Sequence, residues 1–438
     1  MPNGLWGPAV PNRPRRHGSG VPPPALKTVI IDRLAASGEG MAGDVALPYT
    51  LPGETVRARL SGKRGEMEAV LAAAPARVTP PCPHFGPGAQ CGGCALQHMD
   101  RAALLAWKRA RVEAAMLRAG FAVPPVHTHQ SPPRSRRRAR LALRRFADGL
   151  HFGFRQRRSH AVVPMEVCHI LTLPLFTCAR RFAEAAEGLL PKGAINADLV
   201  LTETDTGIDL MILGVDEGGL GLAEREALAN FAEVADLARL SVGEIPLVTR
   251  TPPAMRWGKA SVPVPQGGFL QATADGEAAL RMAVCTGVGA VRSVADLFAG
   301  IGTFSLPLAA TGARVLAAEG APDAVSALRT GAASAGLAVD VLRRDLFTDP
   351  IAAEDLAAFE AVVFDPPRAG AAAQAAAIAE AGVPLVAAVS CQPGTLARDL
   401  RAFSAAYDLT ALTVVDQFLW SGHIEVVAIL RRRHVNSS

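Results

Sequence analysis

The cysteine at position 391 stands where an apolar stretch ends. VPLVAAVS precedes Cys391, and Gln392, Pro393 and a helix-like segment follow it. A cysteine that only fills a core would lie within such a stretch, whereas α/β proteins place reactive groups at the carboxyl ends of strands. A thiolate there can act as a nucleophile; this requires a lowered thiol pKa, and a following helix N-terminus could help to stabilise the thiolate. We therefore predict a nucleophilic Cys391, against the simpler interpretation of a buried cysteine that acts as a small apolar residue.

A glycine-rich turn lies within VADLFAGIGTFSLPLA, residues 294–309, between a predicted strand and a helix. Its glycines let the backbone approach a ligand closely, and the helix amides point at that ligand. Ser305 stands where the dinucleotide motif G-x-G-x-x-G has its third glycine, so that motif is absent. Glu319 and Asp345 end the next two strands, where they could bind the ribose hydroxyls and the base amino group of a nucleoside. A nucleoside site is therefore favoured over an ordinary tight turn.

The segment FDPPRAG, residues 364–370, ends a fourth strand, and its paired prolines fix a rigid turn after Asp365. Amino-methyltransferases also carry D-P-P but place an aromatic residue next, where this chain has Arg368, which argues against N-methylation. A thiolate suits methylation of C5 of uracil instead, because its addition to C6 of the ring makes C5 nucleophilic. A base must then remove the C5 proton, and Glu425, which starts the last strand, could return to the same rim. Taken alone, Cys391 and Glu425 are more simply a buried thiol and a surface carboxylate; the glycine-rich turn favours the catalytic interpretation.

Three of the seven cysteines lie within 13 residues, and two of them have the spacing C-x-x-C. These three are Cys82, Cys91 and Cys94, and Cys168 is the best candidate for a fourth thiolate. Four thiolates suit an iron–sulfur cluster or zinc. A zinc site that mixes cysteine with histidine is the alternative, because three histidines lie close by: His84, His98 and His169. The spacing alone does not distinguish this site from a cluster.

Residues 134–160 hold ten arginines and one acidic residue, interleaved with Phe146, Phe152 and Phe154. Arginines neutralise phosphates, and aromatic rings or guanidinium planes stack on bases. A solvated cationic face is the alternative for individual residues, but it explains ten arginines with so little compensating charge less well. We therefore predict that this segment binds RNA.

The chain has 438 residues, half of them hydrophobic, and a net charge of +5. The elements that position the residues above fall into distinct parts of it. Residues 1–25 are rich in proline, glycine and arginine, which is typical of a disordered tail. Short strand-like runs with glycine-rich turns follow from Thr28 and predict a small OB-like barrel. From about residue 285 strands alternate with helices, which predicts a parallel sheet covered by helices and ending in a hairpin. We see no signal peptide or membrane span, so we expect a cytoplasmic protein.

Together these motifs resemble the RNA 5-methyluridine methyltransferases, and specifically the iron–sulfur-containing branch that acts on 23S ribosomal RNA. The resemblance covers about residue 28 to the end and is carried by CPHFGPGAQCGGC, GFLQATADG, DLFAGIGTF, DPPRAG, SCQPGTLARD and HIEVVAIL. It implies a multidomain α/β protein: a TRAM-like barrel at 26–76, a central α+β iron–sulfur and RNA-binding domain at 77–268, and a Rossmann-like class I methyltransferase domain at 269–438.

The resemblance also implies a role for particular residues, with S-adenosylmethionine as methyl donor and 23S ribosomal RNA as partner of a monomeric enzyme. Cys391 would be the nucleophile and Glu425 the base, and Phe269 would face the target uracil together with Gln271 and Asp365. The [4Fe-4S] cluster would be held by Cys82, Cys91, Cys94 and Cys168. The cofactor contacts would be Gln271, Phe298, Thr303, Glu319, Asp345 and Asp365.

Three departures from the family pattern touch these assignments. The first cysteine interval is longer than is common, Gln392 replaces an asparagine after Cys391, and Thr303 stands where asparagine is frequent.

Three alternative functions remain. A cytosine-5 RNA methyltransferase would carry a cysteine after the proline of the fourth-strand motif, which this chain lacks. A non-catalytic iron–sulfur RNA-binding or assembly factor would not need Cys391 and Glu425, and the tRNA-acting branch lacks the cysteine cluster and the barrel.

Overall fold

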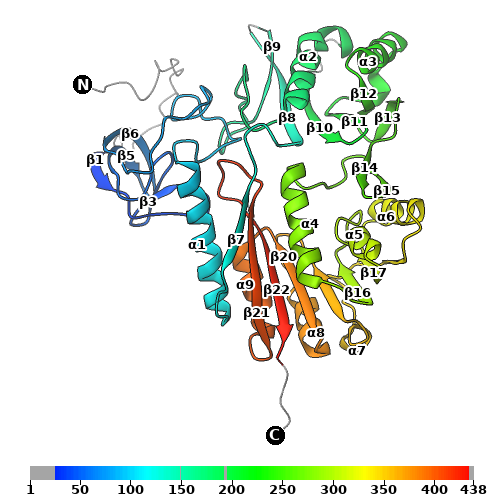
Figure 1. Ribbon diagram of the computed structural model, residues 1–438. Helices are drawn as coiled ribbons and strands as arrows, with labels where there is room; N and C mark the ends of the chain where they lie inside the picture. Colours follow the sequence, from blue (N-terminus) through cyan, green and yellow to red (C-terminus); the bar gives the residue numbers. More distant parts are fainter. Residues whose placement is uncertain (1–24, 148, 192–194, 434–438) are drawn as a thin grey trace.

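The computed structural model describes residues 25–147, 149–191 and 195–433. Three larger sheets and one short hairpin carry its strands, and Figure 1 shows two of these sheets above the third. This arrangement confirms the expectation of a multidomain α/β protein. The tail expected at 1–25 lies outside the described residues except for its last member. No helix in the described ranges is long and apolar enough to cross a membrane.

The first sheet is formed by residues 26–72. Its strands follow the order β1-β5-β6-β4-β3-β2. The first five residues of β5 and of β6 alternate more buried with exposed side chains, as strands with one covered face require. A small β-rich unit at this end of the chain is thus confirmed, while its closure into a barrel stays a prediction. The strands are β1 Leu26–Ile30, β2 Arg33–Leu34, β3 Gly40–Ala42, β4 Val45–Leu47, β5 Thr55–Ser61 and β6 Arg64–Ala72.

The second sheet has the order β13-β12-β11-β10-β8-β9 and carries most of the basic segment on β8 and β9. Two helices, α2 Leu173–Leu189 and α3 Leu222–Val234, pack against it. A short hairpin, β14 Ala254–Trp257 and β15 Ala260–Pro263, follows it in the chain. The strands of the sheet are β8 Arg138–Phe146, β9 Gly149–Gly153, β10 Asn196–Thr204, β11 Gly207–Leu213, β12 Leu237–Val242 and β13 Ile245–Thr249.

The third sheet has eight strands in the order β18-β17-β16-β19-β20-β22-β21-β7. The first five are parallel, and β21 and β22 form the expected antiparallel hairpin. Every residue of β19 and β20 is buried, as strands covered by helices on both faces require. The strands are β7 Val126–Gln130, β16 Ser293–Leu297, β17 Arg314–Glu319, β18 Val339–Arg343, β19 Ala361–Phe364, β20 Leu385–Ser390, β21 Tyr407–Asp416 and β22 Glu425–Arg432.

Helices cover both faces of this third sheet (Figure 1). One apolar core joins a face of the sheet to α1, α8 and α9, and another joins the opposite face to α4, α5, α6 and the β14–β15 hairpin. The helices are α1 Arg101–Ala119, α4 Ala274–Val288, α5 Ser305–Ala310, α6 Pro322–Ser334, α7 Ala353–Leu356, α8 Ala372–Ala381 and α9 Pro393–Leu400.

The third sheet recruits α1 and β7, although both precede the basic segment in the chain. Strand β7 pairs in parallel with β21 at the edge of the sheet, and α1 contacts α9 and β21. A separate apolar core joins the first and second sheets and includes Leu419 and Trp420 from the β21–β22 connection. The connection that leads into β22 is therefore packed against the parts of the chain that carry the cysteine-rich loop.

Candidate active site and thiol cavity

The glycine-rich turn between β16 and α5 lies where the strand order reverses, between β16 and β19. Ligands of open parallel sheets bind at this crevice, beyond the carboxyl ends of the strands. Gly300 and Gly302 have φ angles of +57° and +98°, which residues other than glycine rarely adopt. A Cβ on Gly302 would lie 2.3 Å from Leu328 Cδ1, whereas a Cβ on Gly300 would meet nothing within 4 Å. The turn therefore needs both glycines and leaves open space over Gly300.

Glu319, the last residue of β17, closes this turn from the neighbouring strand. Its carboxylate accepts hydrogen bonds from Gly300 N at 2.9 Å and from Ala321 N at 2.8 Å. Asp345 is exposed beyond β18, and its carboxylate accepts a hydrogen bond from Phe347 N at 3.0 Å. Glu319 thus lies directly on the turn, whereas Asp345 lies in the loop that follows the next strand.

Two other expected cofactor residues lie in the turn itself. Phe298 has a φ of +63°, which is rare for a side chain of this size. Its ring packs against Phe347 and Phe364, with centroids 5.3 Å and 6.0 Å apart. Thr303 is half-buried after the second glycine. The structure therefore gathers Phe298, Thr303 and Glu319 at one rim.

Asp296, which sequence analysis did not identify, lies beneath the turn. Its side chain is fully buried and accepts a hydrogen bond from Ser305 Oγ, while Oδ1 has no partner among the described residues. Burial raises the pKa of this carboxyl to about 7. An acidic residue inside the apolar run VADLF was the available signal, because burying a carboxylate among apolar side chains is costly and points to a function.

Cys391 directly follows β20 and is half-buried beside three charged side chains. Burial is the largest cause that raises the pKa of its thiol, and the Glu425 and Asp365 carboxylates raise it further. Arg368 lowers this pKa by its charge and by a hydrogen bond to the thiol. The lowered pKa that a nucleophilic thiol requires is therefore opposed by burial and two acids and favoured by Arg368, and the contribution of the start of α9 stays a prediction. Asp365 is itself affected: burial and the charge of Asp296 raise its pKa to about 7.

Glu425 begins β22 and is 5% exposed. Burial and Asp365 raise its pKa well above the usual value, while a hydrogen bond from Gln417 opposes this rise. Gln417 is 1% exposed, and its Nε2 also donates to Gln271 Oε1 at 2.6 Å. One buried amide therefore connects Glu425 with Gln271. Gln417 was not identified from the sequence, where it is one polar residue after β21.

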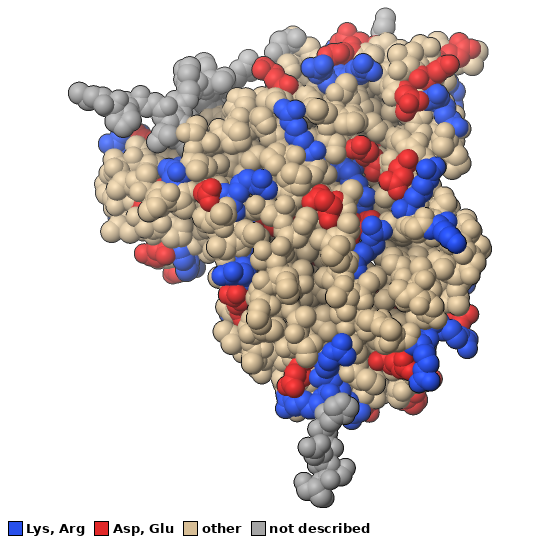
Figure 2. Space-filling view, viewed as in Figure 1, with Lys and Arg blue, Asp and Glu red and all other residues tan. Residues whose placement is uncertain are grey.

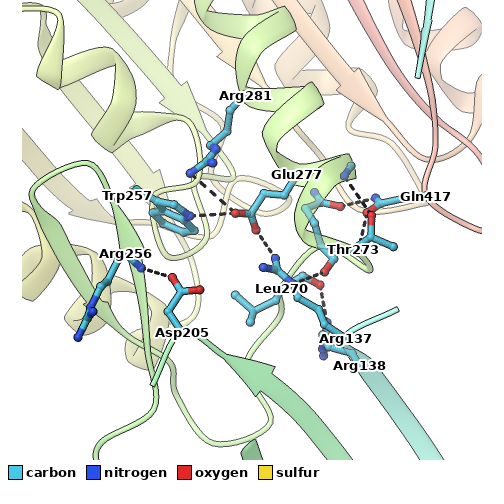
Figure 3. Close-up of polar contacts among 12 residues, drawn as sticks. Arg137, Arg138, Asp205, Arg256, Trp257, Leu270, Thr273, Glu277, Arg281 and Gln417 are labelled. Atoms are coloured by element: carbon cyan, nitrogen blue, oxygen red, sulfur yellow. Dashed lines mark hydrogen bonds and ion pairs between the residues drawn. The ribbon is translucent and has the colours of Figure 1, made fainter. Parts of the chain in front are cut away.

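Arginines at the start of β8 hold the segment that carries Gln271 (Figure 3). Arg137 Nε donates to the Gln271 carbonyl at 3.1 Å, and Arg138 Nη1 donates to the Leu270 carbonyl at 2.8 Å. Arg137 is 5% exposed and pairs with Glu277 of α4. These contacts fix the strand of the second sheet to the first helix of the C-terminal region, and they place Gln271 between the two.

Glu277 also accepts a hydrogen bond from Trp257 Nε1 at 2.9 Å, so both oxygens of its buried carboxylate have a partner (Figure 3). Phe269, expected to face the uracil, is 69% exposed, and the Arg138 guanidinium lies 5.2 Å from its ring centroid. Phe269 therefore lies outside the apolar core, close to the contacts between β8 and the segment before α4.

Most arginines of the basic segment form ion pairs rather than one free cationic surface. Asp198 pairs with Arg140, Arg144 and Arg155, and on the face shown in Figure 2 basic and acidic side chains are interspersed. These three guanidiniums face one carboxylate, so positive charge remains in excess there. Further members pair elsewhere: Arg137 with Glu277, Arg145 with Glu187, and Arg157 and Arg158 with Glu39. RNA binding by this segment stays a prediction.

The four cysteines expected to bind a cluster line one small cavity of about 20 Å³. Burial raises the pKa of each thiol, to about 11 for Cys91. This donor set of four thiols suits an iron–sulfur cluster. The cysteines are Cys82, Cys91, Cys94 and Cys168.

The nearby histidines differ in their placement. His84 and His169 line the cavity, and His84 Nε2 accepts a hydrogen bond from Glu166 N at 3.0 Å. His98 does not line it; its fully buried ring stacks on Phe85, with centroids 5.6 Å apart. Within the described ranges no three His, Cys, Asp or Glu side chains are grouped as a single metal ion would need.

Comparison with known sequences identifies relatives over nearly the whole chain. The family model for tRNA (uracil-5-)-methyltransferase matches residues 266–433. An uncharacterized RNA methyltransferase of Mesorhizobium japonicum is 40% identical, over 92% of this chain and 98% of the relative. The 23S rRNA (uracil(1939)-C(5))-methyltransferase of Shewanella amazonensis is 32% identical, over 96% of this chain and 98% of the relative.

Among solved structures, the tRNA (uracil-54, C5)-methyltransferase of Pyrococcus abyssi has a similar fold, with a TM-score of 0.72 and 21% identity. The match covers 92% of this chain and 99% of that protein. Similarity in sequence along almost the full length, and in fold, agrees with the glycine-rich turn and the strand-end cysteine. The chain therefore belongs to the RNA uracil-5-methyltransferase family.

Proposed function

We propose that this protein transfers a methyl group from S-adenosylmethionine to C5 of a uridine in 23S ribosomal RNA, through a covalent bond between Cys391 and C6 of the uracil. One observation carries the mechanism: Asp365, Arg368 and Glu425 lie close enough to Cys391 at one sheet rim to shift the pKa of its thiol. The relative that is 32% identical over 96% of the chain, and whose name specifies 23S rRNA, supports the choice of RNA.

S-adenosylmethionine, when bound, would supply the electrophilic methyl group to C5 and leave as the neutral thioether S-adenosylhomocysteine. The residues at the glycine-rich turn fit such a nucleoside, because space is open over Gly300 and an unpaired oxygen of buried Asp296 lies beneath the turn. Glu319 is placed to bind ribose hydroxyls by exchanging its bonds to backbone amides. The other contacts in this proposal are Gln271, Phe298, Thr303, Asp345 and Asp365.

The chain's own residues act before and after methyl transfer. The Cys391 thiolate adds to C6, and the electron pair of the C5–C6 double bond moves toward C5 and O4. Arg368 stabilises the thiolate by its hydrogen bond. Once C5 carries the methyl group, Glu425 accepts the remaining C5 proton, the double bond re-forms and the Cys391 thiolate leaves. The raised pKa of Glu425 makes it a stronger base for this step.

Two further assignments belong to this proposal. We propose that Cys82, Cys91, Cys94 and Cys168 hold a [4Fe-4S] cluster, because their thiols share one cavity while His84 Nε2 is already bonded to a backbone amide. The first sheet would be a TRAM-like barrel that helps to bind RNA. The cluster would supply a fixed centre for the cysteine-rich loop, and Cys391 and Glu425 would carry the chemistry without it.

Trapping with 5-fluorouridine tests the mechanism. Fluorine cannot leave C5 as a proton does, so RNA carrying it at the target should remain attached to the enzyme and survive a denaturing gel. Cys391→Ala should form no such complex, while Cys285→Ala, which alters a half-buried cysteine in α4 outside the rim, should trap RNA normally. A normal yield of complex from Cys391→Ala would sink the assignment.

Mass mapping of methylated nucleosides in 23S rRNA and in tRNA, from a strain that lacks the protein, identifies the RNA. Loss of one or more 5-methyluridines from 23S rRNA is expected. A loss confined to tRNA would identify the tRNA-acting alternative. An unchanged pattern in both RNAs, together with growth that is unaffected by Cys391→Ala, would favour the non-catalytic assembly factor.

A further inference from the structure

A cavity of about 420 Å³ lies beside the proposed active site and is separate from it. Its volume is within the range of about 300–1,000 Å³ that small-molecule sites span. Its lining comes from the loop after β2 at residues 36–37, the cysteine-rich loop at 92–95 and the β21–β22 connection at 418–423, together with Arg136, Phe154, Arg157 and Arg368. The cavity therefore lies where the first sheet, the thiol cavity and the connection leading to Glu425 meet.

The charge of this cavity is positive. Arg136, Arg157 and Arg368 line it, and no acidic residue is among its described lining residues. Arg157 Nη1 is buried without a hydrogen-bond partner in the described part of the chain. Buried donors are normally satisfied, so this nitrogen retains an unused hydrogen bond, while Nη2 of the same guanidinium lies 3.9 Å from a carboxylate oxygen of Glu39. Arginine forms strong, often bidentate, hydrogen bonds with phosphate oxygens.

The same cavity has an aromatic wall. Phe154, Phe418 and His423 line it, and the rings of Phe418 and His423 meet at 65° with centroids 5.6 Å apart. Partial burial, Arg368 and other nearby cations lower the pKa of His423, so its ring is neutral at neutral pH. Aromatic rings beside arginines are the surface on which proteins stack the splayed bases of single-stranded RNA.

Arg368 links the cavity to the reaction, because it bonds the Cys391 thiol and also lines the cavity. Cys391 and Glu425 do not line it, so the target uracil would lie on the other side of Arg368. We propose that this cavity binds a second nucleotide of the RNA, adjacent to the target uridine, with its phosphate on Arg136 and Arg157 and its base against Phe418 and His423. This inference rests on the proposed function and names how the RNA is recognised.

Equilibrium binding tests the proposal in a Cys391→Ala background, which prevents turnover. The probe is a single-stranded RNA oligonucleotide that carries the mapped target uridine. Phe418→Ala should weaken binding by about 5- to 150-fold, the usual loss for one stacked base. Phe418→Leu, which keeps the apolar volume, and His423→Ala, at an exposed position, should each weaken binding without disturbing the fold.

Two readouts distinguish a nucleotide site from a structural role. An abasic residue at one position beside the target should weaken binding to the parent, and should cost nothing further in Phe418→Ala. Arg157→Gln should reduce the slope of log affinity against log salt by about 0.7, the value for one phosphate of a single strand, whereas Arg157→Lys should keep the slope. Arg118→Gln, at an exposed site in the last turn of α1, is the matched control and should leave both affinity and slope unchanged.

The outcomes separate this inference from the proposed function. If 5-fluorouridine RNA is trapped normally while the Phe418 and Arg157 variants keep the parental affinity, slope and abasic penalty, the second site is wrong and the proposed reaction stands. If the parental enzyme traps no RNA at all, the proposed function fails and this inference fails with it.

Discussion

At the scale of single residues, the proposed reaction depends on two ionisable groups that are both shifted away from their reactive forms. The thiol of Cys391 needs to lose a proton and Glu425 needs to be ionised when C5 is deprotonated, yet burial raises the pKa of both. Arg368 lowers both pKa values, and Gln417 lowers that of Glu425. The balance between burial and these two partners should therefore set the pH range in which the enzyme works.

Removal of the Glu425 carboxylate separates the two halves of the reaction. Glu425→Gln should still attack uracil and transfer the methyl group, then release product about 100- to 10,000-fold more slowly, the usual cost of losing a general base. Ordinary uridine RNA should therefore accumulate on this variant as a methylated adduct, seen on denaturing gels with a radiolabelled methyl donor. Cys391→Ala should show neither attachment nor methylation. Turnover of Glu425→Gln at the parental rate would remove Glu425 from the site.

The pH dependence of trapping tests the role of Arg368. The thiolate is the reactive form, so the rate of trapping 5-fluorouridine RNA should rise with pH through the pKa of Cys391. Arg368 lowers that pKa, and Arg368→Gln should therefore move the rise to higher pH. Arg398→Gln, which replaces a guanidinium of α9 that pairs with Asp399, should leave the profile in place. An unshifted profile in Arg368→Gln would mean that Arg368 does not act on the thiol.

At the scale of elements, the β21–β22 connection is held by α1 and by the cysteine-rich loop. The amides of Ala95 and Leu96 both donate to the Trp420 carbonyl, at 2.8 Å and 2.9 Å. Lys108 of α1 pairs with Asp416 and also donates to the Phe418 carbonyl at 3.1 Å. Gln417 lies between these anchors, so the contacts that fix the connection also fix the amide that bonds Glu425.

The Lys108–Asp416 pair should be important for stability, because both side chains are fully buried. Lys108→Met leaves the Asp416 carboxylate buried without its partner, which typically costs about 3–5 kcal/mol of unfolding free energy. The double variant Lys108→Met/Asp416→Leu removes both charges and should recover most of this loss. Denaturant unfolding of the three proteins measures the difference, with Arg109→Met, an exposed neighbour on α1, as control. A double variant no more stable than Lys108→Met would argue against the buried charge as the cause.

At the scale of the whole molecule, the thiol cavity lies where the first sheet, the second sheet and the β21–β22 connection share one apolar core. Cys94 lines both the thiol cavity and the larger arginine-lined cavity. A cluster bound by the four thiols would therefore be a structural centre for three segments at once, and its loss should loosen all of them.

Anaerobically purified protein should be brown, absorb at roughly 400 nm and contain about four irons and four sulfides per chain. Cys168→Ser should lose most of this iron and colour. Cys178→Ser is the matched control, since Cys178 is equally buried but lies in α2 and does not line the cavity, and it should keep both. A colourless parental protein with one equivalent of zinc would contradict the cluster.

The sequence alone determined where the reactive groups stand along the chain. Alternation of strands and helices after residue 285 predicted the parallel sheet, and strand ends predicted that the glycine-rich turn and Cys391 share a rim, because parallel strands bring their carboxyl ends together. The hairpin likewise returned Glu425 to that rim. These predictions depend on local periodicity, which sequence displays directly.

Only the tertiary structure decided which groups face each other. Gln417, Asp296 and the ion pairs of the basic segment were not identified from the sequence. Contacts such as the Gln417–Gln271 hydrogen bond and the Arg140–Asp198 ion pair join residues far apart in the chain. The raised pKa of Cys391 has the same origin: a helix start is visible in the sequence, but the desolvation and the neighbouring carboxylates that raise the pKa are set by packing.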